Sequence, residues 1–328
     1  MKIGLIGPPN SGKTTIFNAL TRSAAEVADY SSQKLEPNVS VVDVEDPRVD
    51  RLSEMYEPKK TIYATIDFMD FVGVAKSNDG SELFSGEAMG MVKTSDALAV
   101  VVRNFSNEVI DSVLGPPKPI QDAETVAAEL VLSDLVLVET RLERIANDLQ
   151  RGKKTPQLLA EQKVLQTIHE QLETDVPIRS MELTDEQSRA ISGFQFLSQK
   201  PILCILNSDE DRYGRSAAIV EALSQQFPTS EFAGDFEMQL SQLDDEEEAA
   251  AFMEDLGIEE SARSRLTRMA YDVLGLISFF TVGKDEVRAW TIHQGETAVE
   301  AAGTIHTDLA RGFIRAECFH VDDLFELG

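Results

Sequence analysis

A glycine-rich segment near the start of the chain has the residue types and spacing of a phosphate-binding loop. Gly7 and Gly12 are followed by Lys13 and Thr14, which satisfies the pattern G-x-x-x-x-G-K-[ST]. Glycines let backbone N–H groups converge on phosphate oxygens, the lysine ammonium neutralises the β- and γ-phosphates, and the threonine hydroxyl ligates Mg2+. The alternative is a chance glycine turn, and the flanking elements distinguish the two.

Residues on both sides of this segment predict the elements that such a loop requires. Residues 2–6 form a short apolar run typical of a buried strand, while Ile16, Phe17 and Leu20 have helical spacing over residues 14–21. The helix N-terminus adds a positive dipole end beside the phosphates. The strand, loop and helix therefore occur in the order of a nucleoside triphosphate site.

An acidic position follows the next extended segment. Asp70 and Gly73 form a D-x-x-G pattern at the end of the β-branched run 61–71. The carboxylate could hold Mg2+ through water, and the glycine N–H could meet a γ-phosphate. Residues 74–90 are rich in Gly, Ser, Asn and Asp, so we interpret the pattern as a nucleotide-dependent switch. Position 74 is Val, not the Gln that orients water in many GTPases, so hydrolysis needs another helper.

The apolar strand predicted at residues 201–206 ends where guanine-specific proteins carry N-K-x-D. Here the residues are Asn207, Ser208, Asp209 and Glu210. A guanine clamp needs an Asp carboxylate, whereas Glu210 is one methylene longer and Ser208 lacks the lysine stem. Adenine, whose N6 is a donor, could use Asn207 and main-chain groups near Ser208. The pattern favours adenine over guanine.

Composition and charge exclude several classes of protein. The 328 residues contain 30 Lys and Arg against 57 Asp and Glu, a net charge of −27, so the average field repels nucleic-acid backbones and anionic lipid. Cys204 and Cys318 alone predict neither a disulfide framework nor a zinc site. No run is long enough to span a bilayer and no secretory signal is visible. We expect a cytoplasmic, monomeric protein of two or three domains with no membrane contact.

The middle of the chain has the pattern of two long helices. Apolar residues recur at alternating steps of four and three, and a second set follows a turn at residues 151–156; they are Val131, Leu135, Val138, Leu142, Ile145 and Leu149, then Leu158, Leu165, Ile168 and Leu172. This predicts an antiparallel hairpin that protrudes as an arm; the alternative is two packed helices of a larger core. A further helix is predicted over residues 184–197, with a capping box at its start. Residues 276–328 predict short strands around Gly295 and Gly312 and one small helix at 298–302.

These features together resemble the YchF / Obg-like ATPase family of translation-factor-class P-loop proteins, and the resemblance extends almost from end to end. It is carried by Lys2 to Thr21, Glu36-Pro37-Asn38-Val39, Asp46-Pro47-Arg48, the Asp70 loop, Asn207 to Glu210, Glu286-Val287-Arg288-Ala289-Trp290, and residues 302–308 and 312–317. The resemblance implies an α/β fold: a Ras-like P-loop NTPase domain, an inserted helical coiled-coil hairpin and a C-terminal α+β β-grasp (TGS) domain. The corresponding ranges are 1–122 with 196–274, then 123–195, then 275–328, the last shorter than the family pattern.

The resemblance also implies an ATP-preferring, slowly hydrolysing, Mg2+-dependent protein that associates with the ribosome. Carried over by position, the phosphate-binding residues are Asn10, Ser11, Gly12, Lys13, Thr14 and Thr15. The metal residues are Thr14 and Asp70, beside Gly73, and the base-binding residues are Asn207, Ser208, Glu210, Ala233 and Gly234. Asn10 occupies the place of a K+ ligand in potassium-activated relatives, although an Asn that merely shapes the loop has the same sequence. Lys34 stands where the family has a Thr that contacts Mg2+, and a lysine cannot ligate a metal.

A local basic region offers one route to ribosomal RNA. Residues 141–163 contain six Lys or Arg and three Asp or Glu, a net charge of +3, and Arg151, Lys153 and Lys154 lie at the predicted turn. Screening limits each field to about 8 Å at physiological salt, so a basic tip can act locally on an acidic chain. The alternative is a solvated turn, with the TGS-like domain as the partner surface.

Several functions remain open at this point. The leading one is an ATP-controlled switch with slow hydrolysis; the others are a GTP-binding translation-associated GTPase and a non-hydrolytic, nucleotide-regulated scaffold on the ribosome. A metabolic P-loop kinase shares the phosphate loop, but it would need an arginine-rich lid, which is not evident in the sequence.

Overall fold

The computed structural model describes residues 1–21, 37–71, 86–243 and 246–327. Gly73, Val74 and Lys34, singled out from the sequence, lie outside these ranges. Contacts divide the chain into two compact units. One comprises Met1–Ser40 and Asp67–Ala262, and the other comprises Val41–Ile66 and Arg263–Gly328.

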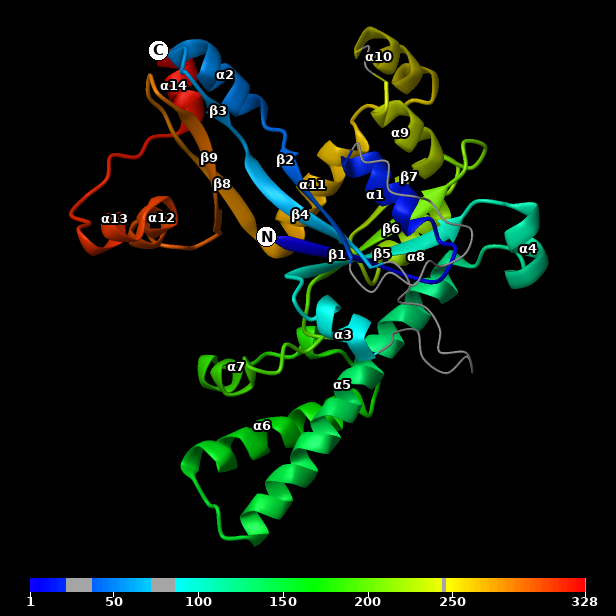
Figure 1. Ribbon diagram of the computed structural model, residues 1–328, viewed down its shortest axis with the longest axis vertical. Coiled ribbons are helices and arrows are strands. Elements are labelled where there is room, and N and C mark those ends of the chain that lie inside the picture. The colour runs from blue at the N-terminus through cyan, green and yellow to red at the C-terminus, as the bar shows by residue number, and fades with distance from the viewer. Residues whose placement is uncertain (22–36, 72–85, 244–245, 328) are drawn as a thin grey trace. The chain divides into compact units, whose positions relative to one another are not determined.

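The larger sheet has six strands in the order β2-β4-β1-β5-β6-β7 (Figure 1), of which β1, β5, β6 and β7 lie wholly within the first unit. From β4 to β7 all neighbouring strands are parallel, so their carboxyl ends lie at one edge of the sheet. The strands are β1 (Lys2–Ile6), β2 (Asn38–Val44), β4 (Ala64–Asp70), β5 (Ala97–Asn104), β6 (Ile202–Ser208) and β7 (Thr229–Phe232). Every residue of β5 and β6 is buried, as expected for central strands of a parallel sheet.

Helices connect and cover these strands. They are α1 (Lys13–Thr21), α3 (Gly86–Val92), α4 (Glu108–Leu114), α5 (Pro119–Gln150), α6 (Pro156–Leu172), the 3-10 turn η1 (Ile178–Ser180), α7 (Asp185–Ile191), α8 (Ala217–Ser224), α9 (Gly234–Ser241) and α10 (Glu246–Asp255). The capping box predicted at residue 184 is present, but α7 ends at Ile191, six residues earlier than the sequence suggested. None of the described helices is long and apolar enough to cross a membrane.

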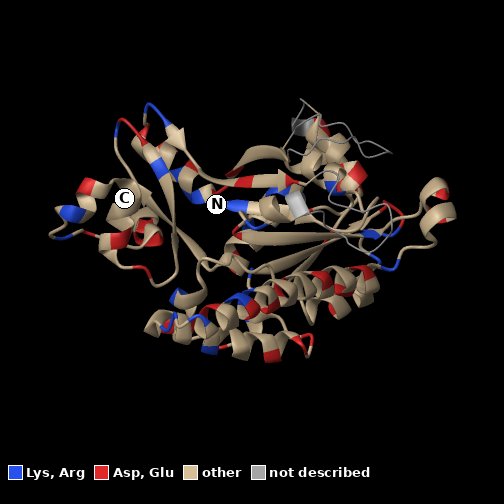
Figure 2. Ribbon diagram, turned by 60° about the horizontal axis from the view of Figure 1, so that its bottom comes forward, with Lys and Arg blue, Asp and Glu red and all other residues tan. Residues whose placement is uncertain are grey.

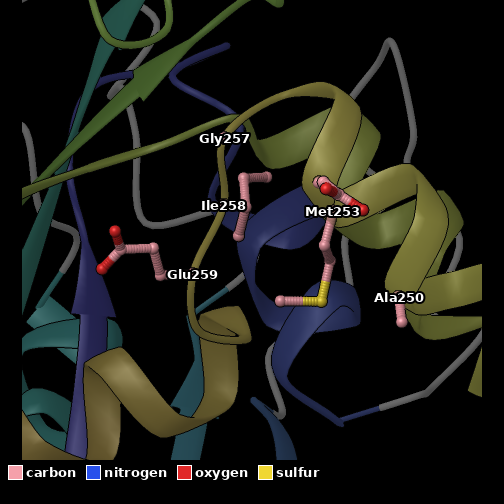
Figure 3. A pocket seen from close by; sticks show the side chains of 6 residues that line it. Ala250, Met253, Gly257, Ile258 and Glu259 are labelled. Carbon is pink, nitrogen blue, oxygen red and sulfur yellow. The ribbon is translucent and has the colours of Figure 1, made fainter.

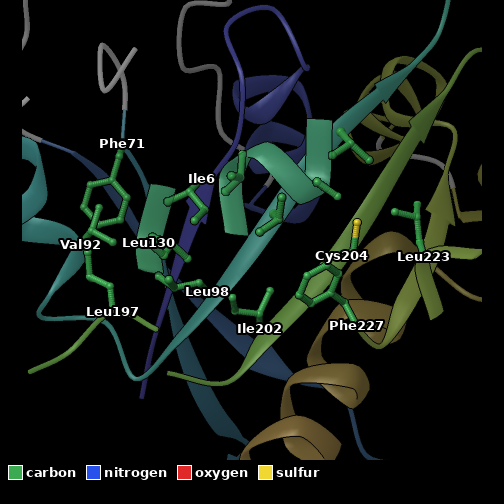
Figure 4. Packing of buried hydrophobic residues seen from close by; sticks show 14 of the residues in the cluster. Ile6, Phe71, Val92, Leu98, Leu130, Leu197, Ile202, Cys204, Leu223 and Phe227 are labelled. Carbon is green, nitrogen blue, oxygen red and sulfur yellow. The ribbon is translucent and has the colours of Figure 1, made fainter. Parts of the chain in front are cut away.

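The main core lies between the sheet and the first half of α5. Figure 4 shows Leu98 of β5, Ile202 and Cys204 of β6, and Leu130 of α5 packed in one buried cluster. Burial of this apolar surface is the main favourable contribution to folding, at roughly 25 cal/mol per Å2. This packing fixes the positions of β5 and β6, and with them the polar residues at the carboxyl ends of these two strands.

The paired helices predicted from the apolar repeat are confirmed. α5 and α6 pack against each other (Figure 1), and the repeat residues form their shared core, in which Val138, Ile145, Leu165 and Ile168 are fully buried. Arg141 and Glu161 form a two-pronged ion pair across the helices, with contacts of 2.6 and 2.9 Å. Figure 2 shows positions of both charge signs interspersed along the helical ribbons.

The second unit has a three-stranded sheet in the order β3-β9-β8. Its strands are β3 (Thr61–Ile62), β8 (Leu276–Thr281) and β9 (Val287–His293). The helices of this unit are α2 (Pro47–Tyr56), α11 (Ala262–Leu274), α12 (Ala298–Ile305), α13 (Thr307–Arg311) and α14 (Val321–Leu327). The sequence predicted one strand over residues 61–71, but two short strands form, and the first pairs in parallel with β9. Val49 and Leu52 of α2 pack on Val287 and Ala289 of β9.

The strand expected around Gly312 is absent from the described part of this unit. Residues 307–311 form α13 instead, because the His306 ring accepts a hydrogen bond from the Asp308 N–H at 3.1 Å and caps the helix N-terminus. The Gly312 N–H then closes the last turn on carbonyls of Asp308 and Ala310. The helix predicted at residues 298–302 is confirmed as α12.

Candidate functional site

Polar residues gather where the parallel strands end. The glycine-rich segment follows β1, Asp70 ends β4, Asn104 ends β5, and Ser208 ends β6. Ala233 and Gly234, at the start of α9, follow β7. Since the carboxyl ends of parallel strands share one edge, this edge is the natural ligand site of the fold.

Backbone geometry in the loop between β1 and α1 requires its two glycines. Gly7 has φ of +148° and Gly12 has φ of +86°. A Cβ at Gly7 would lie 2.3 Å from the Val101 carbonyl oxygen, and one at Gly12 would lie 2.1 Å from Nδ2 of Asn207. Asn10 is exposed and adopts φ of 58°, a left-handed conformation that Asn tolerates better than most residues.

Lys13 lies under this loop. Its ammonium donates to the carbonyls of Gly7 and Pro8 at 3.0 and 2.9 Å. Burial lowers the pKa of Lys13 to about 8, although the nearby Asp70 carboxylate opposes this change. A half-buried ammonium hydrogen-bonded to two neutral carbonyls favours an anionic ligand, and a phosphate group would supply further negative charge beside it.

Thr14 and Asp70 form a pair of oxygen groups suited to a divalent cation. Thr14 Oγ1 donates to Oδ2 of Asp70 at 2.8 Å, and Asp70 is completely buried. Burial raises the pKa of Asp70, while hydrogen bonds from Thr14 and Asn38 and the charge of Lys13 lower it. Among the described residues no donor reaches Oδ1 of Asp70 or Oγ of Ser11. A buried carboxylate oxygen without a partner, beside a hydroxyl, fits a hard cation such as Mg2+.

Asn207 joins the phosphate loop to the start of α9. Its Nδ2 donates to the Ser11 carbonyl at 3.0 Å, and its Oδ1 accepts from the Gly234 N–H at 3.2 Å. The side chain is 3% exposed. Asn207 therefore holds together two of the segments that the sequence assigned to the nucleotide.

The Ser208 side chain turns into a buried network. Its hydroxyl donates to Oε1 of Glu231 at 2.5 Å and accepts from Nδ2 of Asn104 at 2.8 Å. Glu210 is exposed in the following turn. The Ser208 hydroxyl is therefore occupied by bonds within the protein, and the main-chain groups of Ser208 are the ones that a base can contact.

The remaining expected residues lie close to the loop or outside the described ranges. Ala233 is buried, and its N–H donates to Oε1 of Glu237 at 3.0 Å, directly before α9 begins at Gly234. Thr15 is half-buried in the first turn of α1. The helices α1 and α9 pack together, which brings Thr15 and Gly234 to the same side of the sheet.

The sequence analysis assigned no role to three polar residues at this edge. Asn104 and Glu231 hold Ser208, and the Asp209 carboxylate accepts from the N–H groups of Ser106 and Arg212, each at 3.0 Å. Asp209 stands among the four residues after the strand predicted at 201–206, whereas Glu231 lies in β7, a strand that the sequence analysis did not predict.

A separate cavity of about 380 Å3 lies beside α10 (Figure 3). Met253 and Ile258 contribute apolar surface, and Glu254 and Glu259 are its charged lining residues. Two carboxylates without a cation disfavour phosphate binding in this cavity. The edge around Lys13 is therefore the better candidate for a nucleotide.

Two family models match the chain. Residues 2–163 match a family described as "50S ribosome-binding GTPase", and residues 276–328 match YchF-GTPase_C, described as "Protein of unknown function (DUF933)".

Proteins similar over nearly all of this chain are also known. "Ribosome-binding ATPase YchF" of Bacillus subtilis is 37% identical over 99% of this chain and 90% of the relative. The protein of that name in Escherichia coli O157:H7 is 36% identical over 98% of this chain and 89% of the relative. The solved structure "Structure of the Schizosaccharomyces pombe YchF GTPase" is similar with a TM-score of 0.82 and 31% identity, over 99% of this chain and 89% of that one.

Proposed function

The chain belongs to the YchF family, and from this membership we propose that it is an ATP-binding switch protein. In this proposal it hydrolyses ATP slowly in the presence of Mg2+ and acts on the ribosome. The names of its relatives differ on the nucleotide, since the Bacillus subtilis protein is called an ATPase and the Schizosaccharomyces pombe structure a GTPase. The choice of base must therefore be argued from this chain.

The ATP assignment rests on one observation: the polar side chains at and after the end of β6 already form hydrogen bonds within the protein. The Ser208 hydroxyl is engaged by Glu231, and the Asp209 carboxylate is engaged by Ser106 and Arg212. Glu210 is exposed and is longer than the Asp of a guanine clamp. Asn207 is itself hydrogen-bonded to Ser11 and Gly234, so main-chain groups and the second N–H of its amide are what it and its neighbours offer the base. A main-chain carbonyl can accept from the N6 amino group of adenine, whereas guanine presents an acceptor there.

Thr14 and Asp70 would hold Mg2+, Thr14 through its hydroxyl and Asp70 through water. When bound, Mg2+ neutralises negative charge on the β- and γ-phosphates. Lys13 contributes a positive charge to the same phosphates, and the loop N–H groups bind their oxygens. Position 74 is Val, which cannot orient water by hydrogen bonding, and this supports slow hydrolysis.

The cofactor proposal also includes a K+ ion bound at Asn10. Asn10 is exposed and left-handed, which is equally consistent with an Asn that only shapes the loop. Hydrolysis rates in K+ and in Na+ at equal ionic strength separate the two. A K+-specific rate increase that is lost in Asn10→Ala supports the ion site, and equal rates support the loop-shaping role.

Ribosome binding is proposed from the names of the relatives and from the charged turn of the α5–α6 hairpin. Arg151, Lys153 and Lys154 are exposed there, and Lys153 pairs with Asp148 at 2.9 Å. The C-terminal TGS-like unit is the alternative surface. We propose that the protein acts in the cytoplasm, as a monomer.

The domain boundaries expected from the sequence also remain a proposal. They assign residues 1–122 and 196–274 to the nucleotide domain, 123–195 to the arm and 275–328 to the TGS-like domain. Limited proteolysis tests them, since cleavage concentrates in exposed segments between folded parts. Protection of residues 41–66 that depends on the C-terminal unit would move that segment to the last domain.

The deciding experiment is titration of the nucleotide-free protein with ATP and with GTP at fixed Mg2+, followed by single-turnover hydrolysis. Tighter ATP binding with slow release of phosphate is expected. Tighter GTP binding would replace the assignment with a GTPase, in which case Glu210→Asp should change affinity little. Binding without any turnover above that of Lys13→Met would indicate a non-hydrolytic ribosome-associated scaffold.

A further inference from the structure

A buried hydrogen-bond network lies behind the turn that follows β6, and no motif in the sequence accounts for it. Asn104 donates through Nδ2 to the hydroxyls of Ser208 and Ser216, both at 2.8 Å. Ser208 in turn donates to Oε1 of Glu231 at 2.5 Å. Asn104, Ser208 and Ser216 are 4%, 3% and 7% exposed, so water cannot readily replace these bonds. The network joins the ends of β5 and β6 to β7 and to the start of α8.

Glu231 holds both ends of the turn formed by residues 208–214. One carboxylate oxygen accepts from the Ser208 hydroxyl, and the other accepts from the Gly214 N–H at 3.0 Å. Hydrogen bonds to a carboxylate are roughly twice as strong as those between neutral groups. The turn therefore cannot open without breaking a charge-assisted bond to Glu231.

The same stretch of backbone carries the base-binding residues on its other side. Successive side chains of a strand point to opposite faces, and Asn207 accordingly contacts Ser11 and Gly234 while Ser208 contacts Glu231. Asn207 is aligned from the nucleotide side, and Ser208 is anchored from behind. A shift at Ser208 would move the main chain that the adenine contacts.

We propose that Glu231 and Asn104 are positioning residues that hold the 208–214 turn in place for the nucleobase. They act through Ser208 and set the affinity for the nucleoside, whereas the loop around Lys13 sets the affinity for the phosphates. This inference rests on the proposed function, because it requires a base at this edge.

The main test compares Glu231→Gln with the unchanged protein. The glutamine has nearly the same shape and can still accept from Ser208, but its NH2 group would face the Gly214 N–H, and two donors cannot bond. ATP affinity should fall about tenfold, as expected for the loss of one such interaction. The affinity for inorganic tripolyphosphate and the turnover rate at saturating ATP should not change. Glu221→Gln, at an exposed position of α8, is the matched control and should leave all three values unchanged.

A second pair of variants keeps the proposal testable if Glu231→Gln does not fold. Ser208→Ala removes the hydroxyl from the network, and Ser208→Thr retains it. Weaker ATP binding in the first, restored in the second, with tripolyphosphate binding constant in both, supports the positioning role. Equal changes in ATP and tripolyphosphate affinity, or none, would overturn it. If the unchanged protein binds ATP no better than tripolyphosphate, base recognition itself fails, and the proposed function fails with it.

Discussion

The hydroxyl of Thr14 donates a hydrogen bond to Asp70 across 2.8 Å and joins the first turn of α1 to the last residue of β4. Both groups offer oxygen atoms, and the second oxygen of the buried carboxylate has no partner among the described residues. A cation bound here would be held by two elements 56 residues apart in sequence. A Mg2+ dependence of nucleotide binding would therefore test whether α1 and β4 together form one cation site.

Asp70→Asn should weaken Mg2+ binding and stabilise the nucleotide-free protein. The amide keeps the shape of the side chain but removes the charge, and loss of such a metal partner typically costs about 10- to 100-fold in metal affinity. The melting temperature without Mg2+ should rise, because burial raises the pKa of Asp70 and so disfavours its charged form. Mg2+ titration of ATP binding measures the first effect, with Asp67→Asn on the same strand as control. An unchanged Mg2+ requirement would contradict the assignment.

Lys13→Met should abolish most of the phosphate affinity and leave the fold intact. Methionine keeps the aliphatic stem without the charge, and a charged hydrogen bond contributes about 1.5–3 kcal/mol, or roughly 10- to 150-fold in Kd. Calorimetry with ATP measures the loss, and cooperative thermal unfolding without nucleotide is the control. A protein that no longer folds would show that Lys13 has a structural role.

Gly234→Ala should displace Asn207 and weaken nucleotide binding. A Cβ at this position would lie 2.4 Å from Oδ1 of Asn207 and 2.9 Å from Cδ1 of Ile16. Both are shorter than ordinary contacts, so the start of α9 must move, at a cost of about 1–3 kcal/mol. Gly193→Ala is the control, because no atom lies within 4 Å of its added Cβ. Equal melting temperatures for the two variants would show that Asn207 adapts without cost.

Asp134→Asn tests how α5 is attached to the segment before β6. The Asp134 carboxylate is fully buried and accepts from the N–H groups of Leu197 and Ser198 at 3.0 and 2.6 Å. An amide has one acceptor oxygen, so one of these N–H groups would face a donor, at a cost of about 1–3 kcal/mol. Chemical denaturation at pH 7 measures this loss.

The same variant has an expected pH dependence. Burial raises the pKa of Asp134 above its ordinary value, so between the two values the folded protein binds more protons than the unfolded chain. The contribution of Asp134 to stability therefore increases as pH falls through the raised pKa and levels off below the ordinary one. The free-energy difference between the unchanged protein and Asp134→Asn should grow in that direction. A difference that shrinks on acidification would contradict the raised pKa.

Reversing the charges at the α5–α6 turn should weaken ribosome binding without affecting ATP. Changing Arg151, Lys153 and Lys154 to Glu replaces three attractive charges by three repulsive ones and should reduce co-sedimentation about tenfold or more at low salt. Association of the unchanged protein should itself fall as salt rises.

The matched control for that experiment makes the same change of charge elsewhere. Lys59, Lys60 and Lys118 are exposed, and changing them to Glu should leave co-sedimentation unaltered. If both triple variants bind as well as the unchanged protein, the partner surface lies on another part of the chain.

Local patterns predicted much of the first unit. The apolar repeat from Val131 to Leu149 predicted the buried face of α5, because the helical period alone determines which side chains share a face. The strand and helix around Lys13 were equally visible, since that motif lies within one short segment. Thr14 and Asp70 were each predicted as metal residues from a local motif, and the two side chains form a hydrogen bond of 2.8 Å.

Contacts between distant segments could not be predicted in the same way. The bond between Ser208 and Glu231 depends on the register of β6 against β7, which no local pattern encodes. Residues 61–71 have one continuous β-branched pattern, so the sequence did not indicate that Thr61 and Ile62 pair separately with β9. The helix before Gly312 begins at a histidine cap, whereas the sequence analysis predicted short strands around that glycine.

The pairing of β3 with β9 has a consequence for biosynthesis. Thr61 leaves the ribosome more than two hundred residues before Val287, the residue it pairs with. At about 5–20 residues per second, this interval is on the order of 10–50 s. During that time β3 has no partner strand from β9, and Val49 and Leu52 lack the apolar surface of Val287 and Ala289. The nascent chain thus completes this sheet only after Val287 has left the ribosome, and a stall before that residue would leave the early segment open to chaperones and proteases.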